Sequence, residues 1–187
     1  MELKQILSKI YPLPQTSAQK LEQAIKEVNL PKGQLLFKEG KVETDVYLIK
    51  KGIVRAYSIH DGNEVTFWFG HEGDTAISMK SYVLNLPGYE SIELLEDSEL
   101  YHIKAHDLQQ LYNEDIHIAN WGRKFAENEL IKTEERLISR QFKSATERYH
   151  DLLNNTPHLL QRVQLGHIAS YLGITQVSLS RIRSAIK

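Results

Sequence analysis

The chain has 187 residues, of which 41% are hydrophobic and 25% charged, and its net charge at pH 7 is −1. This size suits one large domain, or a medium domain with a small one, in an ordinary soluble globular protein. Cysteine is absent, which excludes disulfides, thiolate zinc sites, cysteine-ligated iron–sulfur clusters and cysteine nucleophiles. No stretch approaches the roughly 18 apolar residues of a membrane helix, and the first residues do not resemble a signal peptide. We therefore expect a cytoplasmic protein without membrane contact.

Charge is distributed unevenly along the chain. Residues 138–187 contain seven basic and two acidic residues, whereas the remainder contains 16 basic and 22 acidic ones. A basic carboxyl-terminal segment in an otherwise acidic chain is typical of a protein whose carboxyl-terminal part binds nucleic-acid phosphates. A solvated basic surface gives the same pattern.

The amino half changes from helical to strand-like patterning. Two short helices are expected over 3–10 and 17–28, separated by prolines. Runs of β-branched and aromatic residues between turn signals then predict strands. The predicted strands cover 35–37, 46–49, 53–59, 65–69, 91–95 and 99–103. The Asp61–Gly62 pair between two of these runs is a strong hairpin signal. Regular short strands indicate a jelly-roll-like β-sandwich, which together with the helices gives an α+β fold.

The segment 105–112 is expected to be helical, and a longer helix is expected to span about 114–140. Its apolar residues recur at loosely helical spacing among charges, at Trp121, Phe125, Leu130 and Leu137. A narrow apolar stripe of this kind favours pairing with a second copy of the chain. The alternative is a helix that packs on its own sandwich.

The carboxyl end, after a break near 141–144 and a helix over 145–153, predicts two short helices joined by a sharp turn. Ile168 and Leu172 share one face of the first helix, and Gly173 supplies the positive φ of a tight exit. Leu179 and Ile182 form the buried stripe of the second helix. This arrangement is the helix-turn-helix signature, whose second helix enters the DNA major groove. An ordinary helical hairpin is the alternative.

DNA contacts are expected mainly from the second helix. The candidates are Thr175 (which we expect to cap the helix), Gln176, Val177, Ser178, Ser180, Arg181, Arg183, Arg162 and Lys187. The Arg181 guanidinium can donate two hydrogen bonds to guanine, Gln176 can reach adenine or a phosphate, and Val177 can meet a thymine methyl. Arg162, Arg183 and Lys187 are phosphate candidates, with a solvated surface role as the alternative.

The chain resembles the Crp–Fnr superfamily of bacterial transcription regulators. The resemblance rests on segments 48–57, 61–66 and 92–100 in the amino half, and on 145–149, 168–174 and 179–183 in the carboxyl half. It implies a cyclic-nucleotide-binding-type sensor domain (1–112), a dimerisation helix (113–140) and a helix-turn-helix DNA-binding domain (141–187).

The effector pocket departs from the family pattern. Relatives that bind cyclic AMP use an arginine followed by serine for the phosphate, and a glutamate after glycine for the ribose. Here the corresponding pairs are Glu90–Ser91 and Gly73–Asp74, and no arginine occurs between Arg55 and Arg123. A semi-buried anion needs a charge-assisted partner. We therefore expect a degenerate pocket that does not bind cyclic AMP, formed by Arg55, Gly73, Asp74, Lys80, Tyr89 and Ser91.

Two departures concern DNA. Valine stands at 177, where the superfamily commonly has glutamate, and the β-hairpin wing that relatives often carry is missing after the recognition helix, so we expect weaker non-specific affinity. Histidines at 60, 71 and 102 leave haem sensing open, although single histidines on strand ends are more often surface residues. No two histidines are two positions apart, so the ligand clusters of metal-dependent jelly rolls are not expected.

The sequence thus predicts a homodimeric, DNA-binding transcription regulator that is not an enzyme and has no cofactor or metal. Its expected partners are double-stranded DNA, a second copy and, for an activator, RNA polymerase. The alternative is a signalling module that binds a small molecule or a protein and keeps a vestigial DNA-binding domain.

Overall fold

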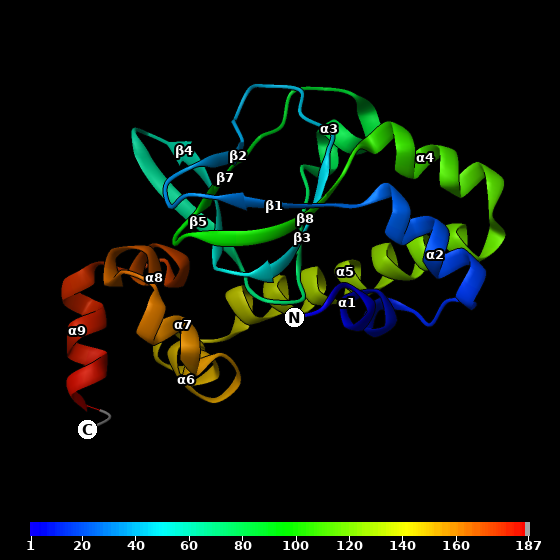
Figure 1. Cartoon of the computed structure of the whole chain (residues 1–187). Helices are drawn as coiled ribbons and strands as arrows, with labels where there is room; N and C mark the ends of the chain where they lie inside the picture. The colour runs from blue at the N-terminus through cyan, green and yellow to red at the C-terminus, as the bar shows by residue number, and fades with distance from the viewer. Residues whose placement is uncertain (186–187) are drawn as a thin grey trace.

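A computed structural model describes residues 1–185 of the chain, and its centre is a β-sandwich (Figure 1). Within these residues, eight strands form two antiparallel sheets with the orders β1-β8-β3-β6 and β2-β7-β4-β5. The strands are β1 (Lys26–Leu30), β2 (Leu35–Phe37), β3 (Val46–Lys51), β4 (Val54–His60), β5 (Asn63–Gly70), β6 (Thr75–Ala76), β7 (Ser91–Leu94) and β8 (Ser98–Ile103). The predicted jelly-roll-like sandwich in an α+β fold is confirmed.

Apolar side chains of both sheets fill the space between them. Ile49 and Leu100 of the first sheet belong to the same buried cluster as Val54, Ala56 and Ile92 of the second. Since side chains alternate along a strand, the residues between these positions point to the outer faces. The same alternation places the charged residues Arg55 of β4 and Glu93 of β7 on the outer face of the second sheet.

The hairpin of β4 and β5 turns at Asp61 and Gly62, as the sequence predicts. Both residues have positive φ, at 51° and 76°, which a tight two-residue hairpin turn requires. The pairing shifts register between Ala56 and Tyr57. The hairpin is therefore bent by a bulge before it reaches the carboxyl-terminal helices.

Helices that precede and follow the strands cover the outer face of the first sheet. α1 (Leu3–Ile10), α2 (Gln15–Ala24), α4 (Ala105–Glu114) and the first half of α5 (Ile116–Phe142) form one buried cluster with β3 and β8. The side chain of Trp121 lies in this cluster, and its Nε1 donates to the carbonyl of Leu7 at 3.0 Å. α5 then continues past the sandwich toward the carboxyl-terminal helices (Figure 1).

The last helices form a small module with its own core. They are α6 (Ala145–Asn155), α7 (Pro157–Arg162), α8 (Leu165–Leu172) and α9 (Gln176–Ala185). The break between α5 and α6 is confirmed, and Ser144 begins α6 with a capping box that includes Glu147. The module's buried cluster includes Ile53 and Phe69 of the sandwich. The module is therefore docked on the second sheet rather than separated from it.

The predicted helix over 17–28 is wrong at its carboxyl end. The helix stops at Ala24, and Lys26–Leu30 form the edge strand β1, with Val28 opposite Leu100 on β8. Val28 and Leu30 alternate with polar residues, and pairing with β8 outweighs the helical continuation of the pattern. The short elements β6, α3 (Met79–Leu84) and α7 were not predicted. In the part of the chain that the structure describes, no helix has the length and apolarity needed to cross a membrane.

Candidate functional site

The second helix of the predicted helix-turn-helix, α9, stands at the edge of the molecule, away from the sandwich (Figure 1). Leu179 is fully buried and Ile182 half-buried against the rest of the module. The Thr175 hydroxyl accepts a hydrogen bond from the backbone N–H of Ser178 at 3.2 Å. Thr175 therefore caps α9 as predicted, and Ser178 is part of the same cap.

The outward side of α9 carries the predicted base-reading residues. The exposed side chains are Gln176, Val177, Ser180, Arg181 and Arg183. Lys187, a predicted phosphate contact, lies outside the described residues. Guanidinium and amide groups on an exposed helix are the chemistry that reads base edges in the major groove.

The turn between α8 and α9 is tight. Gly173 ends α8 with φ 67°, which a residue with a side chain rarely adopts. A Cβ on Gly166 would lie 2.6 Å from Nε2 of Gln176. The amide of Gln176 thus lies against Gly166 at the start of α8, and the two helices with their tight turn are present as predicted.

Arg162 is not a free phosphate contact in this arrangement. It donates to both carboxylate oxygens of Glu72, at 2.7 and 3.1 Å, and also bonds Glu96. Both partners lie in sandwich loops, so the guanidinium is neutralised between the module and the sandwich. The prediction of a DNA-phosphate role for Arg162 is corrected accordingly.

Direct contacts also join α8 to β5. The Ser170 hydroxyl donates to the carbonyl of Glu64 at 2.9 Å and accepts from the N–H of Thr66 at 2.9 Å. The rings of Phe69 and Tyr171 are 5.3 Å apart. The helix-turn-helix is therefore attached to the sandwich by polar and aromatic contacts at once.

Arg55 does not reach the predicted effector pocket. Val54 and Ala56 face the interior, so Arg55 points to the outer face of the second sheet, where it is 2% exposed. Its guanidinium donates to Thr66, Glu64 and Glu93 at 2.6–2.8 Å. The inclusion of Arg55 in the pocket is wrong because a strand's alternation sends it to the other side of the sheet.

Asp74 also faces outward. Its carboxylate accepts from the N–H of His71 at 3.1 Å and lies 3.5 Å from Nζ of Lys132 on α5. Gly73, with φ 94°, lies against Met1 and Lys9 at the amino end. The predicted pair Gly73–Asp74 therefore borders α5 rather than the sandwich interior.

The segment from Gly73 to Ser91, here called the cassette, corresponds to the part of the chain that binds the effector in cyclic-AMP-binding relatives, and it offers a carboxylate where an anion pocket would need a cation. Glu90 is 4% exposed, and its carboxylate accepts from the N–H of Tyr89 at 3.1 Å. Tyr89 itself is exposed, Lys80 is half-buried, and the Ser91 hydroxyl accepts from the N–H of Glu39. The six predicted pocket residues therefore do not converge on one site.

Comparison with known proteins finds a family match for the β-sandwich. Residues 27–115 match the family model of the cyclic nucleotide-binding domain. FixK2 from Bradyrhizobium japonicum is similar in structure, with a TM-score of 0.73 and 21% identity over 87% of this chain and 84% of FixK2. The chain therefore shares the fold of FixK2.

Two further solved structures agree with this fold. One is described as a transcriptional regulator of the crp/fnr family from Eubacterium rectale (TM-score 0.70, 18% identity, 93% of this chain and 85% of that one). The other is CLP, the c-di-GMP responsive global regulator of Xanthomonas campestris (TM-score 0.67, 15% identity, 92% and 91%). No curated protein matches the sequence at a significant level.

The predicted dimer stripe of α5 divides into a buried and an exposed part. Trp121 is 4% exposed beneath α1, so it is unavailable to a second copy, and Phe125 stacks on it at 6.2 Å. Leu130 and Leu137 are more than 60% exposed. Trp121 is therefore corrected to a core residue of its own chain, and the exposed stripe begins further along α5.

The three histidines of the sandwich, His60, His71 and His102, lie in different surroundings. His102 bonds Asp45 through Nε2 at 2.8 Å, and the ring of His71 stands edge-on to that of His158 at 4.8 Å. His60 is exposed at the hairpin tip. Among the described residues, no group of three or more histidine, aspartate or glutamate side chains forms a candidate metal site.

The sequence analysis missed Arg148 and Glu72. Arg148 donates to the carbonyl of Lys143 at the end of α5 and to that of Leu172 at the end of α8, at 2.5 and 2.7 Å. It thereby ties the long helix to the helix-turn-helix. Glu72 anchors Arg162. The Arg148–Leu172 and Arg162–Glu72 contacts join residues far apart in sequence, so no local sequence pattern predicts them.

Proposed function

We propose that the chain is a homodimeric, sequence-specific DNA-binding transcription regulator of the Crp–Fnr type that does not respond to cyclic AMP. The observation that carries this proposal is the capped, exposed α9, with Gln176, Val177 and Arg181 on its outward side. Arg181 would donate its two-pronged hydrogen bonds to guanine, which is worth roughly 1–3 kcal/mol of discrimination. Lys187 and Arg183 would add phosphate contacts.

Dimerisation would place two copies of α9 on two half-sites about one helical turn apart. The exposed stripe of α5 supports this part of the proposal. Leu130 and Leu137 are seven residues apart, as are Ile131 and Ile138, and all four are more than half exposed. A seven-residue apolar repeat is the pattern of a coiled-coil seam.

The effector part of the proposal rests on the cassette. A cyclic phosphate brought beside the buried Glu90 carboxylate would meet a like charge without the guanidinium that offsets desolvation. The alternative function, a signalling module with a vestigial DNA-binding domain, is favoured by Val177, which cannot accept a hydrogen bond from cytosine as glutamate does.

The decisive experiment is a binding selection on randomised duplexes with the wild-type chain and with Arg181→Ala. The variant should lose roughly 1–3 kcal/mol on the selected site and relax preference at one base pair. Arg123→Ala is the matched control, because it removes the same charge from the exposed side of α5 and should leave the selected motif unchanged. If the wild type selects no motif, or if Arg181→Ala selects the same motif with the same affinity, base reading by α9 is wrong.

A further inference from the structure

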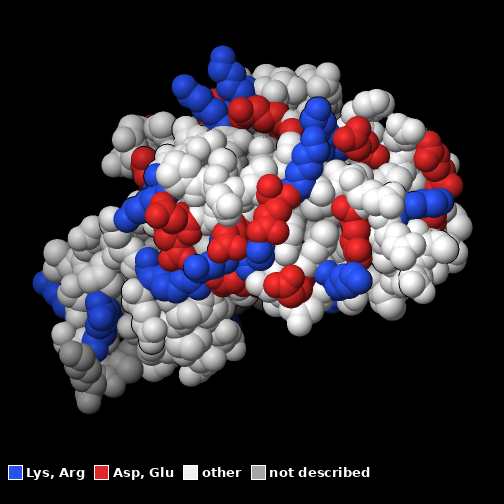
Figure 2. All heavy atoms as spheres, in the orientation of Figure 1, with Lys and Arg blue, Asp and Glu red and all other residues white. Residues whose placement is uncertain are grey.

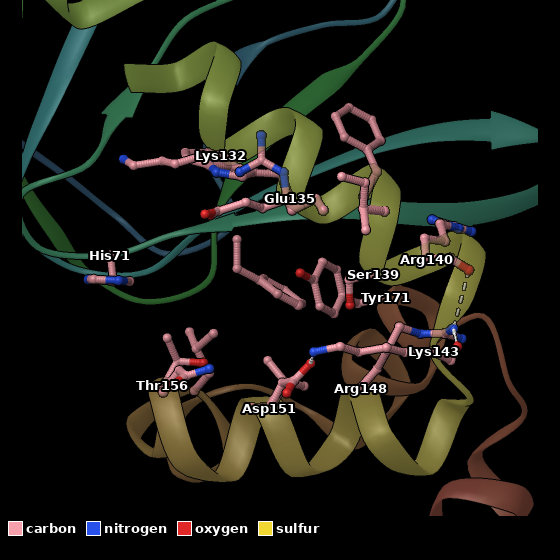
Figure 3. Close-up of a pocket in the computed structure, with 18 residues that line it drawn as sticks. His71, Lys132, Glu135, Ser139, Arg140, Lys143, Arg148, Asp151, Thr156 and Tyr171 are labelled. Atoms are coloured by element: carbon pink, nitrogen blue, oxygen red, sulfur yellow. Dashed lines mark hydrogen bonds and ion pairs between the residues drawn. The ribbon is translucent and has the colours of Figure 1, made fainter. Parts of the chain in front are cut away.

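A cavity of about 630 Å³ lies where the sandwich, the long helix and the helix-turn-helix module meet (Figure 3). Its walls come from the end of β5, the second half of α5, and α6. Ligand cavities of small molecules fall in this size range and often lie between domains. The cavity is separate from the cassette that contains Glu90, and of the residues used in the proposed function only Ile138 lines it.

Basic side chains dominate the cavity. Those that line it are Lys132, Arg136, Arg140, Lys143 and Arg148, against two acidic residues, Glu135 and Asp151. Lys143 is paired with Asp151 at 2.8 Å, and Lys132 with Glu129 at 2.7 Å. The local charge that remains comes mainly from the arginines.

Arg136 and Arg140 form no ion pair with any residue of the described part of the chain. They are four residues apart and so lie on one face of α5, where like charges at this spacing destabilise a helix. An anion between the two guanidinium groups would remove this repulsion and accept their hydrogen bonds. The pair is therefore the natural anchor for a phosphate.

Arg148 also lines the cavity, but its guanidinium is bound by the chain itself. Its terminal nitrogens donate to backbone carbonyls, and its Nε, which has no hydrogen-bond partner within residues 1–185, is buried. In Figure 3, Arg148 and Lys143 lie on one side of the cavity and Tyr171 at its centre.

Aromatic residues form the remaining wall. Phe67, Trp68 and Phe69 line the cavity together with Tyr171, whose ring is 5.3 Å from that of Phe69. Aromatic faces beside cationic groups suit a planar, phosphorylated ligand, because the ring can stack while the phosphates bind the arginines.

We propose that this cavity binds a nucleotide, with its phosphates on Arg136 and Arg140 and its base against the aromatic wall. Ile138, which belongs to the exposed stripe of α5, also lines the cavity, so the cavity borders the proposed dimer contact. Because the walls belong to the sensor, α5 and the module, the bound nucleotide stabilises the docked arrangement.

Calorimetric titration of the full-length chain with each of the four ribonucleoside triphosphates tests the binding directly. At least one should bind with micromolar affinity. Inorganic pyrophosphate should bind at least tenfold more weakly, and the free nucleoside should show no binding. The double variant Arg136→Gln/Arg140→Gln should weaken binding by at least tenfold. Arg123→Gln, on the first half of α5, is the matched control and should bind as the wild type does.

The proposal is overturned if no triphosphate binds, if pyrophosphate binds as tightly as the best nucleotide, or if the control variant loses as much affinity as the double variant. Circular dichroism checks that the double variant is folded. The two arginines could instead contact DNA phosphates. In that case the double variant would weaken binding to duplexes of every sequence, no nucleotide would bind, and the proposal would again fail. The titration contains no DNA, so its outcome is independent of whether α9 reads bases.

Discussion

Arg162 of α7 and Glu72 in the loop after β5 form a two-pronged ion pair across 90 residues of sequence. Glu72 also accepts the backbone N–H of Gly52 at 3.0 Å, and Arg162 bonds Glu96 as well. The guanidinium thus joins two sandwich loops to the helical module. Figure 2 shows acidic and basic side chains alternating along the edge where the sandwich meets the module. The pair is therefore a direct ionic link between the module and the sandwich.

Replacing Arg162 by glutamine should loosen the module. The change leaves two carboxylates close together without their cation, and the cost should be about 1–2 kcal/mol because the groups are partly exposed to solvent. Hydrogen exchange should become faster through α7 and α8 and stay unchanged in β3 and β8. Arg123→Gln, which breaks an exposed pair with Glu127 on α5, is the control. Equal exchange in wild type and Arg162→Gln would contradict the assigned role.

The same pair gives the docking a defined pH dependence. Burial alone would raise the pKa of Glu72. Hydrogen bonds from Arg162 and Gly52 outweigh this effect, and the net pKa falls from 4.5 to about 2. A depressed carboxyl pKa stabilises the folded state above the unfolded value, and this contribution disappears as pH falls from about 4.5 to about 2. Urea unfolding followed across this range should show a steeper loss of stability for the wild type than for Glu72→Gln. Parallel curves would show that Glu72 is not the responsible group.

Dimerisation should depend on the exposed part of the α5 stripe. Leu137→Glu places a charge on a side chain that is 63% exposed in the single chain, so it should leave the fold intact and abolish a coiled-coil contact. Light scattering should give the mass of two chains for the wild type at micromolar concentration and of one chain for the variant. Ile59→Glu is a matched control, since Ile59 is 59% exposed on the β4 hairpin. A wild type that is already monomeric would refute the stripe's role.

Local patterns account for what the sequence predicted well. The helix-turn-helix follows from positions that are close in sequence: Gly173 makes the turn, Thr175 caps α9, and Leu179 fills its core side. The Asp61–Gly62 hairpin is local in the same way. Such features are set by backbone conformation and spacing, which a single sequence displays.

Features that depend on distant partners were not predictable in this way. The sequence does not show which face of the sheet Arg55 occupies; the register of β4 with β7 places it beside Glu93 on the outer face. The sequence likewise does not show that Arg162 is paired, because its partners Glu72 and Glu96 are 90 and 66 residues away. The strand β1 is not recognisable locally, because its hydrogen-bond partners lie on β8, far along the chain.

Cyclic nucleotides should bind no more tightly than roughly millimolar, equivalent to about −4 kcal/mol. The reason is the buried Glu90 carboxylate in the cassette and the outward orientation of Arg55. Calorimetric titration with cyclic AMP and cyclic GMP provides the measurement. Micromolar binding that Arg136→Gln/Arg140→Gln leaves intact would locate a cyclic nucleotide in the cassette and refute this interpretation.

Val177 should determine part of the DNA preference. It is exposed in the first turn of α9, where residues of a recognition helix meet base edges. Valine offers only methyl groups, which suit a thymine methyl, whereas glutamate accepts a hydrogen bond from the cytosine amino group. Val177→Glu should therefore shift the selected motif toward cytosine at one position per half-site and change affinity there by roughly 1–3 kcal/mol. Val177→Gln separates this effect from size, because it keeps the length of the side chain without its charge. If the glutamate variant selects the wild-type motif from randomised duplexes, position 177 does not face the bases.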